Sequence, residues 1–78
     1  MRVLFFAQLK DIAGVGEWSV AGDGLSATEL WDLLMARWPG LAAHREQTRL
    51  ARNGVYAGSD EVFGAADEVA LIPPVSGG

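Results

Sequence analysis

The sequence predicts a single α+β domain in which one main helix packs across one face of a small β-sheet. Three patterns lead to this expectation: strand-like apolar runs near both ends of the chain, one amphipathic helical stretch after residue 24, and an Asn-Gly turn signal at residues 53 and 54. The chain has 78 residues, half of them hydrophobic and 21% charged, which is enough for one domain with a real core. We expect this domain over residues 1–72 and an extended C-terminal tail over residues 73–78.

The first expected element is a strand over residues 2–9, a nearly unbroken apolar run. Its low polarity predicts that both of its faces are covered. Gly14 and Gly16 then indicate a turn, and residues 17–20 alternate polar and apolar as a half-buried strand does. The two segments are therefore expected to form a β-hairpin.

The element with the clearest sequence signal is a helix that begins after Ser26. Ser26 and Glu29 have the spacing of a capping box, in which each side chain satisfies the backbone N–H of the other residue. One apolar stripe at helical spacing follows: Ala27, Leu30, Trp31, Leu34 and Trp38. We expect the two tryptophans to belong to the core, and the Pro39-Gly40 pair to end the helix.

The next expected element is a second hairpin around Asn53 and Gly54. Residues 41–49 before it show no clear period, and only a short helical turn is expected there. Residues 50–52 and 55–57 flank the Asn-Gly pair, which tolerates the positive φ angles of a type I′ turn. Turn chemistry accounts for Asn53, so we assign it no functional role.

The last part of the chain is expected to be a loop followed by one more strand. The loop over residues 58–67 carries the apolar pair Val62-Phe63, which is expected to plug the core. Residues 68–72 form the final strand, and a proline pair ends it. Acidic residues at positions 60, 61, 67 and 68 lie in or beside turns, so we interpret them as solvated carboxylates.

Composition excludes several kinds of site. The chain has no cysteine and a single histidine, His44, so a thiolate nucleophile and a Cys/His metal cluster lack their ligands, and we expect no bound metal or cofactor. The net charge is −4 and the basic residues are scattered, which disfavours nucleic acid as a ligand. No apolar run approaches the roughly 20 residues needed to cross a bilayer. Without a leader sequence or a membrane segment, the cytoplasm is the expected location.

The C-terminal tail is where chemistry is expected. Pro73 and Pro74 favour an extended backbone, and Gly77 and Gly78 have no side chains, so the tail predicts a thin arm that is stiff at its base. A merely frayed terminus would not need this proline base. Six residues at about 3.3 Å each reach about 20 Å, enough to enter a deep slot on another protein. The Gly78 carboxylate, with an ordinary pKa of about 3.5, is ionised at neutral pH and needs activation, for which adenylation with ATP is the simplest route.

Two segments carry a family resemblance: the opening Val3-Leu4-Phe5-Phe6-Ala7-Gln8-Leu9 and the ending Asp67-Glu68-Val69-Ala70-Leu71-Ile72-Pro73-Pro74-Val75-Ser76-Gly77-Gly78. They resemble the MoaD family, the small sulfur-carrying subunit of molybdopterin synthase, which has a ubiquitin-like β-grasp fold. The likeness spans essentially the whole chain and implies a mixed sheet of four to five strands with a flexible Gly-Gly tail. Family members often have glycine where this chain has Ala66.

The resemblance also implies a function for the tail. Gly78 would be adenylated by a ubiquitin-activating-like enzyme, which consumes ATP, and then converted to a thiocarboxylate. The tail would insert into the large subunit of the synthase, in a heterotetramer of two small and two large subunits, and give its sulfur to a cyclic pyranopterin precursor. By position, the residues that line the inserted arm are Gly77, Ser76, Val75 and Pro74.

The sequence gives less information about the surface on which a partner would dock than about the tail. An apolar face near Phe6 and the last strand would suit a carrier that is handed between two proteins. Burial of Phe6 in the core is an equally open alternative.

Three other functions stay open. The same carrier chemistry would serve thiazole or cysteine synthesis. The chain could instead be a protein modifier joined through Gly78 to lysines of a target, although its single lysine, Lys10, disfavours lysine-linked chains of the modifier itself. It could also be a plain interaction domain with a passive tail.

Overall fold

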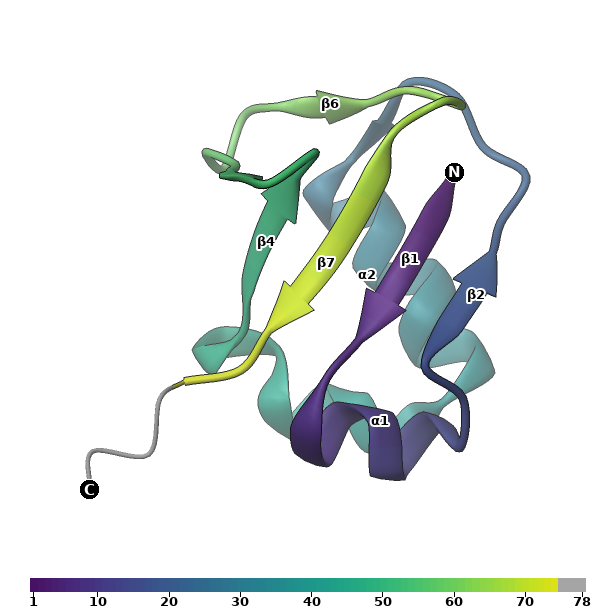
Figure 1. Ribbon diagram of the computed structural model, residues 1–78, viewed down its shortest axis with the longest axis vertical. Helices are drawn as coiled ribbons and strands as arrows, with labels where there is room; N and C mark the ends of the chain where they lie inside the picture. The colour runs from purple at the N-terminus through teal and green to yellow at the C-terminus, as the bar shows by residue number, and fades with distance from the viewer. Residues whose placement is uncertain (75–78) are drawn as a thin grey trace.

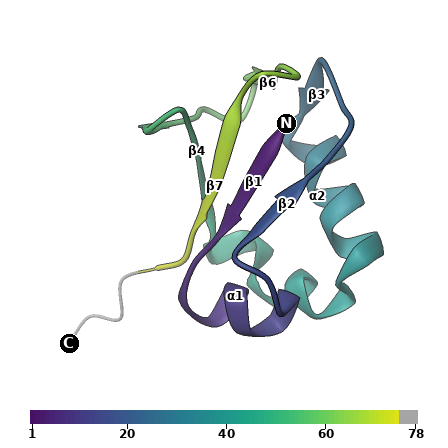
Figure 2. The same cartoon turned by 45° about the vertical axis from the view of Figure 1, so that its right-hand side comes forward.

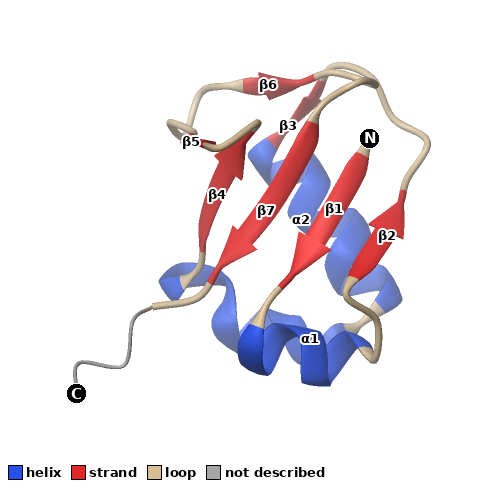
Figure 3. Ribbon diagram, viewed as in Figure 1, coloured by secondary structure: helices blue, strands red, loops and turns tan. Residues whose placement is uncertain are grey.

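The computed structural model describes residues 1–74, and its centre is a mixed five-stranded sheet with one face covered by helix α2 (Figures 1 and 2). The sheet has the strand order β2-β1-β7-β4-β5, and a two-stranded sheet pairs β3 with β6 (Figure 3). The strands are β1 (Arg2–Phe5), β2 (Glu17–Ser19), β3 (Leu25–Ser26), β4 (Arg49–Arg52), β5 (Val55–Tyr56), β6 (Val62–Phe63) and β7 (Glu68–Ile72). The helices are α1 (Ala7–Ala13), α2 (Ala27–Arg37) and the 3-10 helix η1 (Pro39–Gln47). The predicted α+β class, with its main helix across one face, is confirmed.

Strand β7 is the central strand of the five-stranded sheet. It runs parallel to β1, with Leu71 opposite Phe5, and antiparallel to β4, with Ile72 opposite Arg49. Both of its edges are therefore paired, which fixes the position of the last strand before the tail.

The core lies between the sheet and the helices. Its fully buried side chains are Val3, Phe5, Leu9, Leu30, Leu34, Leu41, Phe63, Val69 and Leu71. Because side chains alternate along a strand, the inward positions of β1 and β7 fill this core while Leu4, Ala70 and Ile72 lie on the opposite face. That outer face is only partly covered, so the expectation that both faces of the first strand are buried is wrong.

Helix α2 begins as predicted. The Glu29 backbone N–H donates to the Ser26 hydroxyl at 3.1 Å, and the Ser26 N–H donates to the Glu29 carboxylate at 3.0 Å. The buried residues of the helix are Leu30, Trp31 and Leu34. Trp38, at its C-cap, packs edge to face on Phe5 and Trp18 with ring centroids 5.1 and 5.0 Å apart. The core role of both helix tryptophans is confirmed.

The first strand is shorter than predicted, because it ends at Phe5 and the following residues form α1. The chain leaves the strand direction at Ala7, which has a positive φ of 50°. Helix α1 then places Leu9 in the core and ends at Gly14, whose left-handed backbone lets its N–H donate to the Lys10 carbonyl. Strands β1 and β2 do pair antiparallel, but a helix connects them where a simple turn was expected.

The second half of the chain follows the prediction more closely. Asn53 and Gly54 have φ angles of 51° and 87°, as a type I′ turn requires, and they connect β4 to β5. The short helical turn expected before them is the longer 3-10 helix η1. Of the apolar pair expected in the core, Phe63 is buried but Val62 is 52% exposed, because the two neighbours point to opposite faces of β6.

Candidate functional site

The described part of the tail is its base. The predicted sulfur-bearing residue Gly78 and the predicted arm residues Gly77, Ser76 and Val75 lie outside the described residues. Pro73 and Pro74 follow the end of β7 and belong to no regular element. The structure therefore places the point from which the tail leaves the domain and the surface that surrounds this point.

An apolar hollow of about 330 Å³ lies on the outer face of the sheet and extends to the end of β7. It is lined by Leu4, Phe6, Ala51, Gly54, Tyr56, Glu68, Ala70 and Ile72, and we call it the docking hollow. Its floor is made of small side chains, because Ala51 of β4 and Ala70 of β7 lie opposite each other in the sheet. Leu4 lies opposite Ala70 on one side, and Tyr56 lies opposite Ala51 on the other, so larger side chains form the two walls.

Phe6 lines this hollow and is 45% exposed, so the alternative that it is a core residue is wrong. Its neighbour Phe5 fills the core, and the backbone stays extended through Phe6 before it bends at Ala7. An exposed phenylalanine costs free energy in water unless another surface covers it. The predicted apolar face near Phe6 and the last strand is thus present.

Several members of the hollow were missed from the sequence, above all Tyr56 and Leu4. The alternation rule could have found Leu4, because Leu4 on β1 and Phe6 in the extended backbone just after it share one parity, as do Ala70 and Ile72 on β7. The relative placement of β1, β4 and β7 was the missing information.

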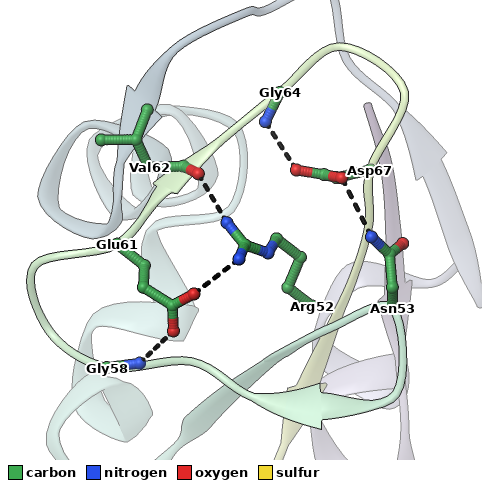
Figure 4. A network of polar contacts seen from close by, with 7 residues as sticks. All are labelled: Arg52, Asn53, Gly58, Glu61, Val62, Gly64 and Asp67. Atoms are coloured by element: carbon green, nitrogen blue, oxygen red, sulfur yellow. Dashed lines mark hydrogen bonds and ion pairs between the residues drawn. The ribbon is translucent and has the colours of Figure 1, made fainter.

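A network of polar contacts holds the β4–β5 hairpin to the loop that precedes β7 (Figure 4). The Arg52 guanidinium donates to the Val62 carbonyl at 2.9 Å and forms an ion pair with Glu61 at 2.7 Å. The Glu61 carboxylate also accepts the Gly58 backbone N–H. These contacts keep the hairpin that carries Tyr56 in a fixed position beside the loop.

The second half of this network involves Asn53 and Asp67 (Figure 4). The Asn53 amide donates to Asp67 at 3.0 Å, and its carbonyl oxygen accepts the Glu68 backbone N–H at 2.9 Å. Asp67 also accepts the Gly64 N–H at 2.7 Å. The hydrogen bond from Gly64, followed by the one from Asn53, lowers the pKa of Asp67 below its ordinary value of 3.8.

This network adds contacts to two interpretations made from sequence. Asn53 forms the predicted turn, but its side chain also joins that turn to β7. The carboxylates of Glu61, Asp67 and Glu68 were interpreted as simply solvated, yet each has a specific partner, which for Glu68 is Arg2 at 2.6 Å.

A second hollow, larger and more polar, lies at the opposite end of the sheet from the tail. It has a volume of about 640 Å³ and is lined by Met1, Arg2, Ser19, Val20, Ala21, Asn53, Ala65, Ala66, Asp67 and Glu68. Arg2 and Glu68 lie at the starts of β1 and β7, whereas the tail leaves at the end of β7. The tail therefore leaves the sheet beside the docking hollow and away from this second hollow.

Residues 1–74 hold no group of three or more His, Asp or Glu side chains placed to bind a metal ion. Within the same residues, no helix is long and apolar enough to cross a membrane. What the described residues offer is an apolar hollow beside Pro73 and Pro74, the base of the tail.

Comparison with known proteins identifies the family. The model of the ThiS family matches residues 3–78. The molybdopterin synthase sulfur carrier subunit of Chlamydomonas reinhardtii is 36% identical, over 100% of this chain and 98% of its own length. The corresponding subunit of Drosophila erecta is 40% identical, over 100% of this chain and 90% of its own length.

Among solved structures, the small archaeal modifier protein SAMP1 of Haloferax volcanii superposes with a TM-score of 0.85 at 32% sequence identity. The match covers 100% of this chain and 98% of that one, and it confirms the predicted β-grasp fold. The chain belongs to the ThiS family, in agreement with the resemblance carried by its opening and closing segments.

Proposed function

We propose that this chain is a sulfur carrier of molybdopterin synthesis and that its working group is the terminal carboxylate of Gly78. The observation that carries the proposal is the position of the tail, which starts at the end of the central strand β7, directly beside the docking hollow. A partner that covers the hollow would thereby be placed next to the tail. Full-length relatives named as molybdopterin synthase sulfur carrier subunits support the assignment.

The proposed chemistry has two stages before the sulfur is used. First, a carboxylate oxygen of Gly78 attacks the α-phosphorus of ATP, which forms an acyl adenylate and releases pyrophosphate. A sulfur nucleophile at the oxidation level of sulfide then attacks the carbonyl carbon, and AMP leaves. The product is a thiocarboxylate, and no net oxidation or reduction has occurred.

The sulfur is then transferred to the pyranopterin precursor. The thiocarboxylate sulfur displaces an oxygen leaving group from a precursor carbon, so that a carbon–oxygen bond breaks as the carbon–sulfur bond forms. Water then hydrolyses the thioester bond between that sulfur and the Gly78 carbonyl carbon. This step leaves the sulfur on the precursor and restores the Gly78 carboxylate. The carrier can therefore be used again.

In the proposed function, the partner proteins catalyse the reactions and this chain carries the sulfur. A ubiquitin-activating-like adenylyltransferase consumes the ATP, and the large subunit of molybdopterin synthase receives the tail in an assembly of two small and two large subunits. Pro74, Val75, Ser76 and Gly77 line the inserted arm, while Phe6 and the docking hollow take an apolar side chain of the partner. No cofactor is held by the carrier, and we place the exchange in the cytoplasm.

Intact-mass spectrometry tests the proposal. After incubation with the adenylyltransferase, ATP and a sulfur donor, the mass of the chain should rise by the difference between one sulfur and one oxygen atom. A chain without Gly78 serves as the control and should show no shift. An unchanged wild-type mass in the presence of an enzyme that thiocarboxylates another carrier would contradict the proposal.

A second candidate function is protein modification, which the likeness to the small archaeal modifier protein SAMP1 favours. Here the activated Gly78 would form an amide with a lysine of a target protein. Tryptic digestion cuts this chain last at Arg52, so the remnant on a target lysine would be the peptide from residue 53 to residue 78. Detection of this remnant in cells that express the chain, and its loss when Gly78 is deleted, would establish the second function.

A further inference from the structure

Arg49 is stacked on an aromatic wall of the docking hollow. Its guanidinium carbon lies 4.0 Å from the ring centroid of Tyr56, a cation–π distance. Tyr56 is itself 54% exposed, and Arg49 is exposed as well. In the sheet, Arg49 lies opposite Ile72, the last residue of β7 before the tail. The cation is thus held at the end of the docking hollow from which the tail leaves.

The charge of Arg49 is not neutralised within residues 1–74. The ion pairs of these residues join Arg2 to Glu17 and Glu68, and Arg52 to Glu61, and Arg49 takes part in none of them. The whole chain has a net charge of −4. Arg49 is therefore a local positive charge on an acidic protein, beside the surface to which a partner is proposed to bind.

Stacking on Tyr56 prepares the guanidinium for binding. The planar group has fewer orientations available when it lies on the ring, so less side-chain entropy is lost when a ligand is bound. Its fixed fork of N–H donors matches the two oxygens of a carboxylate. A charge pair at the border of an apolar contact also loses solvent screening once the contact forms.

We propose that Arg49 binds a carboxylate of the synthase large subunit and so sets the orientation in which this partner lies on the docking hollow. The inference rests on the proposed function, because it takes the large subunit as the occupant. The partner surface it predicts has an apolar side chain for the hollow and an Asp or Glu at the tail end of it. Arg49 is in this sense a specificity residue for docking, with no role in the chemistry at Gly78.

Charge reversal tests the proposal, and the chain offers a matched control. Arg37 also stacks on an aromatic ring, Trp38, with its guanidinium carbon 4.9 Å from the ring centroid, but it belongs to the last turn of α2. Arg49→Glu and Arg37→Glu therefore change the net charge equally and each removes one stacked arginine. We expect Arg49→Glu to weaken binding to the large subunit by about tenfold or more, and Arg37→Glu to change it by less than about twofold.

Further measurements separate docking from folding and identify the partner carboxylate. Urea unfolding of each variant shows whether the domain is intact, and Arg49→Gln, which removes the charge without reversing it, should still weaken binding and lower its dependence on salt. In an Arg49→Lys variant, a carbodiimide should join the new amine to the partner carboxylate as an amide with loss of water. Peptide mapping of the cross-linked complex identifies that carboxylate, and Arg37→Lys is the control for cross-linking at an unrelated surface.

The outcomes distinguish the docking role of Arg49 from the proposed identity of the partner. Binding of the wild type with equal losses for the two charge reversals would overturn the role of Arg49 and leave the sulfur carrier function standing. Failure of the thiocarboxylated wild-type chain to bind the large subunit at all would overturn the proposed partner and this inference together. Selective loss with Arg49→Glu, together with a cross-link specific to position 49, supports it.

Discussion

The side-chain amide of Asn53 lies 3.0 Å from the carboxylate of Asp67, and this hydrogen bond joins the β4–β5 turn to the start of β7. The backbone N–H of Asn53 also donates to the Glu68 carbonyl at 2.8 Å. One wall of the docking hollow, Tyr56, is on that hairpin, while part of its floor, Ala70, is on β7. The contact therefore supports the placement of this hairpin beside β7, which the strand pairing between β4 and β7 also sets.

The first prediction concerns this contact. Asn53→Gly keeps the positive φ of the turn but removes the side-chain bridge, and it should lower the free energy of unfolding by about 1–2 kcal/mol. Urea denaturation measures the change. In an Asp67→Ala background the same substitution should cost less, because one of the two bridged groups is already gone. Equal costs in the two backgrounds would mean that the two side chains do not act together.

The second prediction concerns pH. The folded-state pKa of Asp67 is lowered by the Gly64 and Asn53 hydrogen bonds, so its ionised form contributes stability above the unfolded value of 3.8. This contribution is lost as the pH falls through the lowered folded-state pKa. The stability difference between the wild type and Asp67→Asn should therefore be largest near neutral pH and shrink below pH 3.8. Urea midpoints measured across this range check it, and a difference that is independent of pH would contradict it.

The third prediction compares the neighbours Phe5 and Phe6. Phe5 is buried in the core, so Phe5→Ala should lower the free energy of unfolding by about 3–5 kcal/mol. Phe6→Ala should change stability by less than about 1 kcal/mol but weaken binding to the large subunit. Val55→Ala, at a residue that is 70% exposed and does not line the hollow, is the matched surface control and should leave binding unchanged.

The fourth prediction is that the small floor of the hollow is required for docking. Ala70→Phe would fill the space between Leu4 and Tyr56, so a partner side chain could no longer enter. We expect affinity for the large subunit to fall by about tenfold, measured by calorimetry. Ala36→Phe, on the exposed surface of α2, adds the same side chain away from the hollow and should have little effect. If Ala70→Phe bound the large subunit as tightly as the wild type does, the docking surface would have to lie elsewhere on the domain.

Local signals allowed much of this fold to be predicted from the sequence. The Ser26–Glu29 capping box and the Asn53-Gly54 turn are each specified by residues close together in the chain, and both occur as expected. Helix α1 was missed because its first residues continue the apolar run of β1, and the change of direction depends on the positive φ of Ala7. Alanine gives no sequence signal for that conformation.

The candidate site was only partly predictable, for a different reason. Phe6 and the end of the last strand were identified, but the hollow is formed by residues from β1, β4, β5 and β7, which are distant in sequence. The Asn53–Asp67 bridge spans 14 positions in the same way. Such contacts depend on strand order and register, which no short stretch of sequence specifies.

The central position of β7 also governs when the carrier becomes usable during its synthesis. Strand β1 is made well before its parallel neighbour β7, and β4 pairs with that same strand. The sheet cannot close until β7 is inserted, and pairing between such distant segments is slow compared with local contacts. A nascent chain that has not yet been extended through β7 therefore lacks the docking hollow too, so the proposed partners would have no such surface by which to bind an unfinished chain.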